Sequence, residues 1–349
     1  MPTIREQLEA YEKETLSKHA ALSANSKGRS KSEPADPLRT CYQVDRDRIL
    51  QSKSFRRLKG KTQVFLAPVG DHYRTRITHS LEVSQVARTI CKSLRLNEDL
   101  AEAISLGHDL GHTPFGHSGE AILSRLHPEG FYHPFQSVRI VEELENEGRG
   151  LNLTYEVRDG ILKHSKGRGP ILTNNPRLLA DTWEGQVVRL SDIIAYASHD
   201  VDDAIRADVF RYDDIPSEIR KALGKNYEHR FQTMCTDVVE STISGDGTRV
   251  LMSEPVLHAI NDLRTFLFKN VYESNKVKGE FDKCEEILKS LYGYYKEHPE
   301  ELREQIGEGL FNRYTLERNI CDFISGMTDQ FALDLFREFF FPKPWPRGL

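Results

Sequence analysis

Apolar side chains recur along most of this chain at the spacing of an α-helix. Between residues 77 and 94 an apolar residue returns every three to five positions, which predicts a helix with one buried face. Asn97 predicts the cap of a second helix that runs towards His108. A longer stripe predicts a third helix over residues 187–205. The stripes consist of Ile77, Leu81, Val86, Ile90 and Leu94, then Leu100, Ala103 and Ile104, then Val187, Leu190, Ile193, Ile194, Ala197, Val201 and Ile205.

The remainder of the chain also favours helices. Thr113 followed by Pro114 predicts the start of a helix that carries His117 and Glu120. Residues 253–341 hold further helical patterns, with breaks predicted near 279, 298 and 307–309, where Gly and Pro occur. Residues 159–186 predict loops around short elements, and residues 64–66 are the best strand candidate. We therefore predict a mostly α fold.

Three parts are expected along the 349 residues, a length that suits one large domain or two smaller ones. Residues 1–40 are polar and predict a flexible N-terminal arm, with a short helix at 8–16 and a loop at 23–37. Residues 41–210 would form the catalytic core. Residues 211–349 would form a helical region packed on that core.

Composition narrows the class of protein. Hydrophobic residues make up 38% and charged residues 29%, which is typical of a soluble globular protein. No apolar run approaches the roughly 18 residues of a membrane helix, and the N-terminus lacks the apolar core of a secretory signal. We therefore expect a cytoplasmic protein. The five cysteines are scattered and form no C-x-x-C pair, which argues against a disulfide framework or a zinc ribbon.

The net charge of −5 argues against nucleic acid as the main partner of the whole surface. The charge is uneven, because residues 46–61 hold seven basic residues and one acidic residue, Asp47. Such a run suits a polyphosphate or a nucleic-acid strand, although a solvated helix face is the commoner explanation of a charge run.

The densest chemistry lies between residues 108 and 120, which contain His108, Asp109, His112, His117 and Glu120. Polar groups at this density are costly to bury without a metal or a chemical task. His79 on the first predicted helix and Asp192 in an apolar part of the third can join His108 and Asp109 at one point. Two imidazoles and two carboxylates suit Mn, Fe, Co, Ni or Zn, and suit Mg alone less readily. Each residue taken singly is more often a core or surface residue.

Two further sets can act on a substrate. His117 and Glu120 are three residues apart on one predicted helix, so the carboxylate can orient the imidazole as a general acid or base. Tyr196 and Asp200 follow Asp192 by four and eight residues and share its helix face. A tyrosine and a carboxylate there can contact a sugar, although core packing explains Tyr196 equally well.

These residues carry a family resemblance. The order His79, His108-Asp109, Asp192 resembles the signature of HD-domain phosphohydrolases. The flanking segments resemble deoxyguanosinetriphosphate triphosphohydrolases over about residues 36–341. The segments are residues 46–58, 61–65, 74–83, 107–117, 131–138, 192–200 and 315–329. The chain lacks the large insertions of the long members of that family and is similar to its short subgroup.

The resemblance implies an HD-domain helical fold with additional C-terminal helices, and hydrolysis of a dNTP to a deoxynucleoside and inorganic triphosphate. It implies one divalent metal ion per active site, drawn from Mn, Mg, Co, Ni, Fe or Zn. The metal would be held by His79, His108, Asp109 and Asp192. Proton transfer would fall to His117 with Glu120. The implied substrate contacts are His112 and His133 on the phosphate side, Gln63 and Arg76 near sugar and phosphates, and Tyr196 and Asp200 at the deoxyribose.

The resemblance also suggests that the protein forms a homo-oligomer, commonly a hexamer in this family. It further suggests that a second dNTP activates the enzyme and that single-stranded DNA is a partner. It does not decide the preferred base. Two other hypotheses stay open at this point. One is a different HD hydrolase that acts on nucleoside monophosphates or signalling nucleotides. The other is a regulator that binds nucleic acid through residues 46–61.

Overall fold

The protein is described from a computed structural model that covers residues 1–63, 74–165, 167, 169–173, 175–272 and 275–342. Helices make up the fold, and no strand forms among these residues beyond isolated bridges between Arg29 and Thr154 and between Thr62 and Thr75. The prediction of a mostly α fold is confirmed. The strand candidate at residues 64–66 lies outside the described residues.

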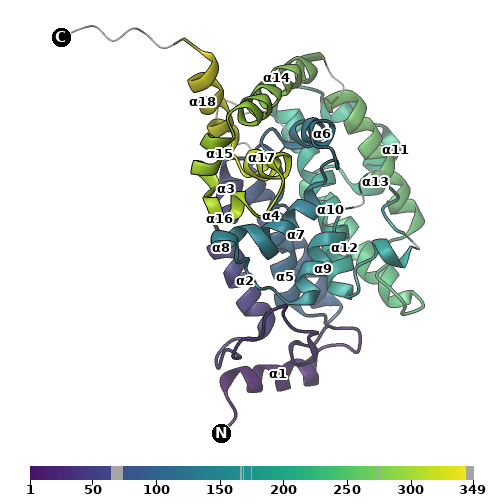
Figure 1. Ribbon diagram of the computed structural model, residues 1–349. Helices are drawn as coiled ribbons and strands as arrows, with labels where there is room; N and C mark the ends of the chain where they lie inside the picture. The colour runs from purple at the N-terminus through teal and green to yellow at the C-terminus, as the bar shows by residue number, and fades with distance from the viewer. Residues whose placement is uncertain (64–73, 166, 168, 174, 273–274, 343–349) are drawn as a thin grey trace, which may run out of the picture.

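Residues 1–206 contain the helices up to α10 (Figure 1). Their bounds are α1 Ile4–Thr15, η1 Ser23–Asn25, α2 Cys41–Gln51, α3 Lys53–Arg57, η2 Leu58–Gly60, α4 Arg76–Ser93, α5 Glu98–Gly107, α6 Gly116–Leu126, α7 His133–Arg139, η3 Ile140–Leu144, α8 Glu145–Gly148, α9 Tyr155–Lys163, η4 Pro176–Leu178 and α10 Trp183–Arg206. Helices α4, α5 and α10 pack against one another at the centre.

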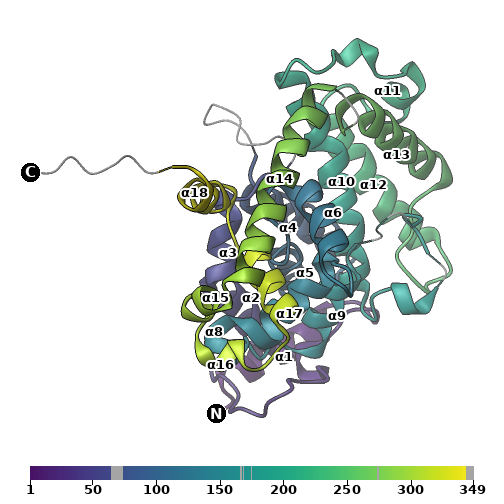
Figure 2. The ribbon, with the colours of Figure 1, turned by 45° about the horizontal axis from the view of Figure 1, so that its top comes forward.

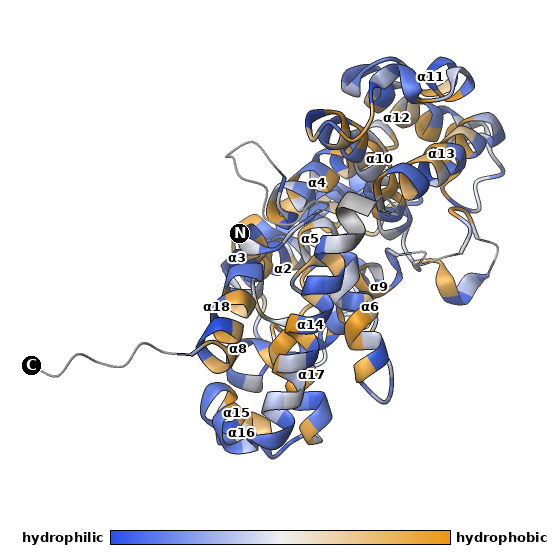
Figure 3. Ribbon diagram, turned by 90° about the horizontal axis from the view of Figure 1, so that it is seen from above, coloured by the Kyte–Doolittle hydropathy of each residue, from blue (hydrophilic) through white to orange (hydrophobic). Residues whose placement is uncertain are grey.

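The C-terminal helices fall into two groups on either side of this centre, as the view from above shows (Figure 3). The first group comprises η5 Tyr212–Asp214, α11 Ser217–Leu223, α12 Tyr227–Ser244, α13 Glu254–Leu267 and η6 Phe268–Tyr272. The second comprises α15 Pro299–Ile306, α16 Glu308–Phe311, α17 Leu316–Ser325 and α18 Asp329–Phe340. The long helix α14, Asn275–Glu297, connects them (Figure 2).

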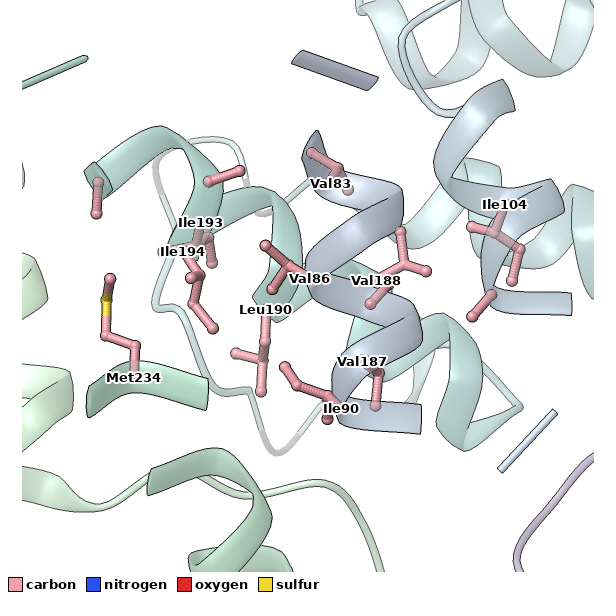
Figure 4. Packing of buried hydrophobic residues seen from close by; sticks show 14 of the residues in the cluster. Val83, Val86, Ile90, Ile104, Val187, Val188, Leu190, Ile193, Ile194 and Met234 are labelled. Carbon is pink, nitrogen blue, oxygen red and sulfur yellow. The ribbon is translucent and has the colours of Figure 1, made fainter. Parts of the chain in front are cut away.

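Two clusters of buried apolar side chains hold these groups to the core. In the first, Val86 and Ile90 of α4 lie beside Leu190 of α10 (Figure 4). This cluster continues through α12 and α13. The second joins Phe115, Ile122 and Leu123 to α14, α17 and α18. Both clusters remove apolar surface from water, which is the main favourable contribution to folding.

The structure also corrects three details of the predicted elements. Leu81 is 52% exposed, so the buried face of α4 is formed by Val83, Val86, Ala87 and Ile90 instead. Helix α6 starts at Gly116 after a left-handed Phe115, so the predicted start at Thr113 and Pro114 is wrong. Helix α14 runs through Gly279 without the predicted break, whereas the breaks near 298 and 307 are present.

The N-terminal segment contacts the core through side-chain hydrogen bonds. Glu184 of α10 accepts a hydrogen bond from the backbone N–H of Ala21 at 3.0 Å, and Arg29 forms an ion pair with buried Asp45. Glu156 accepts one from the backbone N–H of Lys27 at 2.7 Å. Predicted domain boundaries at residues 40 and 210 stay predictions. None of the helices in the described part of the chain has the length and apolar composition that crossing a bilayer requires.

Candidate active site

The four predicted metal ligands meet where α4, α5 and α10 converge. His79 Nε2 on α4 lies 3.0 Å from Asp192 Oδ1 on α10 and 4.0 Å from Asp109 Oδ2. His108 Nε2, directly after α5, lies 3.3 Å from Asp109 Oδ1 and 3.9 Å from Asp192 Oδ1. Ligand atoms about 2.0–2.2 Å from one cation are separated by roughly 3–4 Å, so this spacing suits a single metal ion.

The orientation of His108 supports the same conclusion. Its Nδ1 lies 2.6 Å from the carbonyl oxygen of Ser105, so Nδ1 carries the proton and donates it there. Its Nε2 is buried and has no hydrogen-bond partner among the described residues. A buried lone pair without a partner is costly. The Nε2 lone pair points at the carboxylates, so the donor set fits a divalent metal, and His79, His108 and Asp109 form a group of metal-ligating type.

The charges of the site keep both carboxylates ionised at neutral pH. Burial alone would raise the pKa of Asp109, but electrostatic interactions with its neighbours, among them the Arg76 guanidinium, hold it well below its ordinary value. Arg76 donates a hydrogen bond from Nη1 to Asp109 Oδ2 at 2.8 Å. Burial likewise opposes ionisation of Asp192, and the hydrogen bond from His79 outweighs it and lowers the pKa. Ionised carboxylates are the form that binds a metal.

A second set of side chains adjoins the first. His112 Nε2 lies 3.4 Å from Asp109 Oδ1, and the His112 ring stacks on His133 at a centroid distance of 3.9 Å. Glu120 accepts hydrogen bonds from the backbone N–H of His133 at 2.8 Å and from its Nδ1 at 2.9 Å. His117 Nδ1 is 3.9 Å from Glu120 Oε2. Glu120 therefore contacts His133 more closely than His117, the partner predicted from sequence.

His164 was not predicted from the sequence, and the structure places it inside the site. Its Nε2 lies 3.2 Å from His133 Nε2, and its ring meets the edge of the His108 ring at 4.9 Å. Its Nδ1 faces the carbonyl of Ile161 at 2.7 Å. The Nδ1 atoms of His133 and His164 both face acceptors, so the hydrogen bond between their Nε2 atoms needs one further proton. Burial and the neighbouring histidines lower the pKa of His164 to about 3, so His164 is the acceptor in this bond at neutral pH.

The remaining predicted contacts lie around this centre. Gln63 is the last described residue before the gap at 64–73, and its backbone carbonyl lies beside Gly116. Its Oε1 is buried and has no hydrogen-bond partner in the described residues. Tyr196 and Asp200 follow Asp192 on α10, and their placement relative to Asp192 follows from the helix. Asp200 is buried, whereas Tyr196 is half-buried.

The basic run at residues 46–61 is partly neutralised. Arg46 pairs with Asp47 at 3.0 Å and with Asp99 at 3.2 Å, and Arg48 pairs with Glu33 at 2.7 Å. Lys61 is buried. Less of the positive charge is therefore available to an external phosphate backbone than the sequence alone indicates.

Comparison with known families agrees with the geometry. The sequence model of the HD domain matches residues 76–197, and that of the phosphohydrolase-associated domain matches residues 250–338. Curated relatives named deoxyguanosinetriphosphate triphosphohydrolase-like protein match almost from end to end. The chain is 50% identical to the protein of Desulfatibacillum aliphaticivorans, covering 98% of this chain and 99% of the relative. It is 48% identical to that of Caldanaerobacter subterraneus, covering 98% and 97%.

A third relative, from Clostridium perfringens, is 46% identical over 97% of this chain and 98% of its own length. The HD-domain match and the buried His/Asp group indicate a metal-dependent phosphohydrolase. The chain therefore belongs to the family of deoxyguanosinetriphosphate triphosphohydrolase-like proteins within the HD-domain phosphohydrolases.

Proposed function

We propose that this protein hydrolyses deoxynucleoside triphosphates at the α-phosphate and releases a deoxynucleoside and inorganic triphosphate. The convergence of His79, His108, Asp109 and Asp192, with the lone pair of His108 Nε2 directed at the carboxylates, is the observation that carries the proposal. The printed names of the relatives supply the substrate class.

These four side chains would hold one divalent metal ion. Two imidazoles and two carboxylates favour Mn, Fe, Co, Ni or Zn over Mg alone. Such a metal polarises a phosphate oxygen and lowers the pKa of a bound water towards ~7. The ionised state of Asp109 and Asp192 supports this assignment, because ligand carboxylates must be deprotonated.

The phosphates would lie beside the cationic side of the site. Arg76 contacts Asp109 through Nη1, and its Nε and Nη2 are buried with no hydrogen-bond partner among the described residues. A guanidinium with spare donors can bind phosphate oxygens. His112 and the hydrogen-bonded pair of His133 and His164 would contact the same oxygens.

The P–O5′ bond breaks as water attacks the α-phosphorus, so the departing 5′-oxygen needs a proton. His117 is suited to donate it because its side chain is 59% exposed beside the buried cluster, within reach of a bound substrate. Glu120 would support the protonated imidazole, and its own pKa is far below the ordinary value because nearby histidines outweigh burial.

The sugar would rest against α10. Asp200 would accept a hydrogen bond from a sugar hydroxyl, and the Tyr196 ring would leave no space for a 2′-hydroxyl. Gln63, with an unpartnered buried oxygen among the described residues, would contact the sugar from the opposite side. The homo-oligomer, the activating dNTP and the single-stranded DNA partner stay predictions.

The test is product analysis with purified protein, Mn²⁺ and each of the four dNTPs, singly and mixed. We expect inorganic triphosphate and a deoxynucleoside. We expect His117→Ala to retain bound metal and to lose about 100-fold or more in kcat, the usual scale of general-acid catalysis. His258→Ala is the matched control, because His258 is exposed on α13 and pairs with Asp262.

Release of pyrophosphate or single phosphate would contradict the proposal. Turnover of nucleoside monophosphates or guanosine polyphosphates in place of dNTPs would instead identify a different HD hydrolase. Wild-type kcat in His117→Ala would refute the role of His117 and leave the reaction class intact.

A further inference from the structure

The segment from His112 to His117, which leads into α6, is held by residues near the C-terminal end of the chain. Asp329 opens α18, in the region that matches the phosphohydrolase-associated domain. Its Oδ1 accepts a hydrogen bond from the backbone N–H of Phe115 at 2.9 Å. The next residues, Gly116 and His117, begin α6. One carboxylate near the C-terminus therefore contacts the backbone two residues before His117.

The other oxygen of Asp329 holds the segment next to Gln63. Asp329 Oδ2 accepts hydrogen bonds from the backbone N–H of Thr62 at 2.9 Å and from the Thr62 hydroxyl. Lys61 adds a parallel connection, because its Nζ donates to the carbonyl of His112 and to that of Ser325, the latter at 2.8 Å. The segment 61–62 thus lies between the active-site loop and the C-terminal helices.

Asp329 is not needed to cap its own helix. Thr328 is the N-cap of α18 and accepts a hydrogen bond from the backbone N–H of Phe331 at 3.2 Å. Asp329 is 6% exposed, and its described hydrogen bonds all go to Thr62 and Phe115. A buried carboxylate is costly unless its oxygens are bonded. Its burial is therefore best explained by the two segments that it joins.

Phe115, whose N–H makes this contact, has an unusual backbone conformation. It has φ 62° and ψ 23°, a left-handed conformation that side chains larger than glycine rarely adopt. Its ring is buried in the second apolar cluster with Leu123, Leu288 and Ile324, and its N–H is fixed by Asp329. Such conformations persist only where the surroundings determine them, and they concentrate at functional sites.

We propose that Asp329 is a positioning residue, which fixes His117 and Gln63 relative to each other and makes the phosphohydrolase-associated region part of the catalytic apparatus. The inference rests on the proposed function for the role of His117. Asp329 makes no described hydrogen bond to the predicted metal ligands on α4, on α10 and directly after α5, so its loss should leave the metal site intact.

The experiment measures kinetics, metal content and amide hydrogen exchange on the full chain. We expect Asp329→Ala to keep its bound metal and to change KM little, while kcat falls roughly 30-fold, part of the usual general-acid contribution. Exchange should rise in residues 60–63 and 111–117 and stay unchanged in α4 and α10. Asp334→Ala, an exposed carboxylate on the same helix that pairs with Arg337, should match the wild type.

Two further variants test the same contact if Asp329→Ala folds poorly. Asp329→Asn preserves shape but turns an amide nitrogen towards a backbone N–H, so it should lower kcat in the same way. Thr62→Val removes only the hydroxyl donor and leaves both N–H bonds, so kcat should change by less than about threefold, as expected for one lost hydrogen bond.

The double variant Asp329→Ala with His117→Ala separates positioning from general damage. If Asp329 acts through His117, the double variant should be no slower than His117→Ala alone. The inference would be overturned if the kcat losses of the two single variants multiplied in the double variant. Unaltered hydrogen exchange in residues 111–117 of Asp329→Ala would also overturn it. A wild type that releases no triphosphate would refute the proposed function instead. The hydrogen-exchange measurement would still show whether Asp329 orders residues 60–63 and 111–117.

Discussion

At the scale of single residues, Asp192 provides the most direct test of the proposed metal centre. Its Oδ1 is within 3.9 Å of both His79 Nε2 and His108 Nε2. Asp192→Asn keeps the shape of the side chain but removes its negative charge. The affinity for the metal should therefore fall on the order of 100-fold, the upper end of the range found when residues around a metal site are substituted. The change in affinity is measured as the amount of metal that stays bound after dialysis against increasing concentrations of a chelator.

Asp213→Asn is the control for that measurement, because Asp213 is exposed and pairs with Arg220. Equal metal retention in the two variants would show that Asp192 is not a metal ligand.

The sequence could suggest Asp192 because an aspartate in an apolar helix needs a partner. It gave no comparable signal for His164, whose proximity to His133 arises only when α9 and α7 pack together.

At the scale of elements, one buried arginine on α10 shapes the loop after His164. Arg189 donates hydrogen bonds to the backbone carbonyls of residues 163, 165, 170, 171 and 178 at 3.2–3.3 Å. Lysine has no planar fork and cannot reach these acceptors together. Arg189→Lys should therefore lower the free energy of unfolding by about 2–4 kcal/mol, because buried carbonyls lose charged donors.

Urea unfolding measures this change, with Arg206→Lys at the exposed end of the same helix as the control. An effect of Arg189→Lys no larger than that of Arg206→Lys would contradict the prediction.

Helices such as α4 and α10 could be predicted from the sequence because their apolar periodicity is local. The start of α6 could not, because it follows a left-handed Phe115 whose N–H bonds to Asp329, 214 residues away in the chain.

At the scale of the whole molecule, Glu184 links three parts of the fold. Its Oε1 accepts hydrogen bonds from the backbone N–H of Ala21 in the N-terminal segment and from that of Asn97 at the start of α5. Glu184 itself lies in the first turn of α10 and is fully buried. Burial raises its pKa from 4.5 to about 7, and the two backbone donors oppose that rise without cancelling it.

This raised pKa predicts how stability depends on pH. Between pH 4.5 and 7 the folded state holds a proton on Glu184 that the unfolded state releases, so the free energy of unfolding falls as the pH rises. The loss should reach roughly 3 kcal/mol, because each unit of pKa shift corresponds to about 1.4 kcal/mol. Glu184→Gln mimics the protonated side chain and should lack this component.

The measurement is urea unfolding of the wild type and Glu184→Gln at several pH values between 4 and 8. Carboxylates elsewhere titrate in both proteins, so the difference between the two curves isolates Glu184. Near pH 4 the proteins should be similarly stable, and by pH 7 the variant should be the more stable. Glu228→Gln, an exposed position on α12, should follow the wild type throughout. Parallel curves for the wild type and Glu184→Gln would mean that Glu184 is already ionised in the folded protein, held so by its backbone donors.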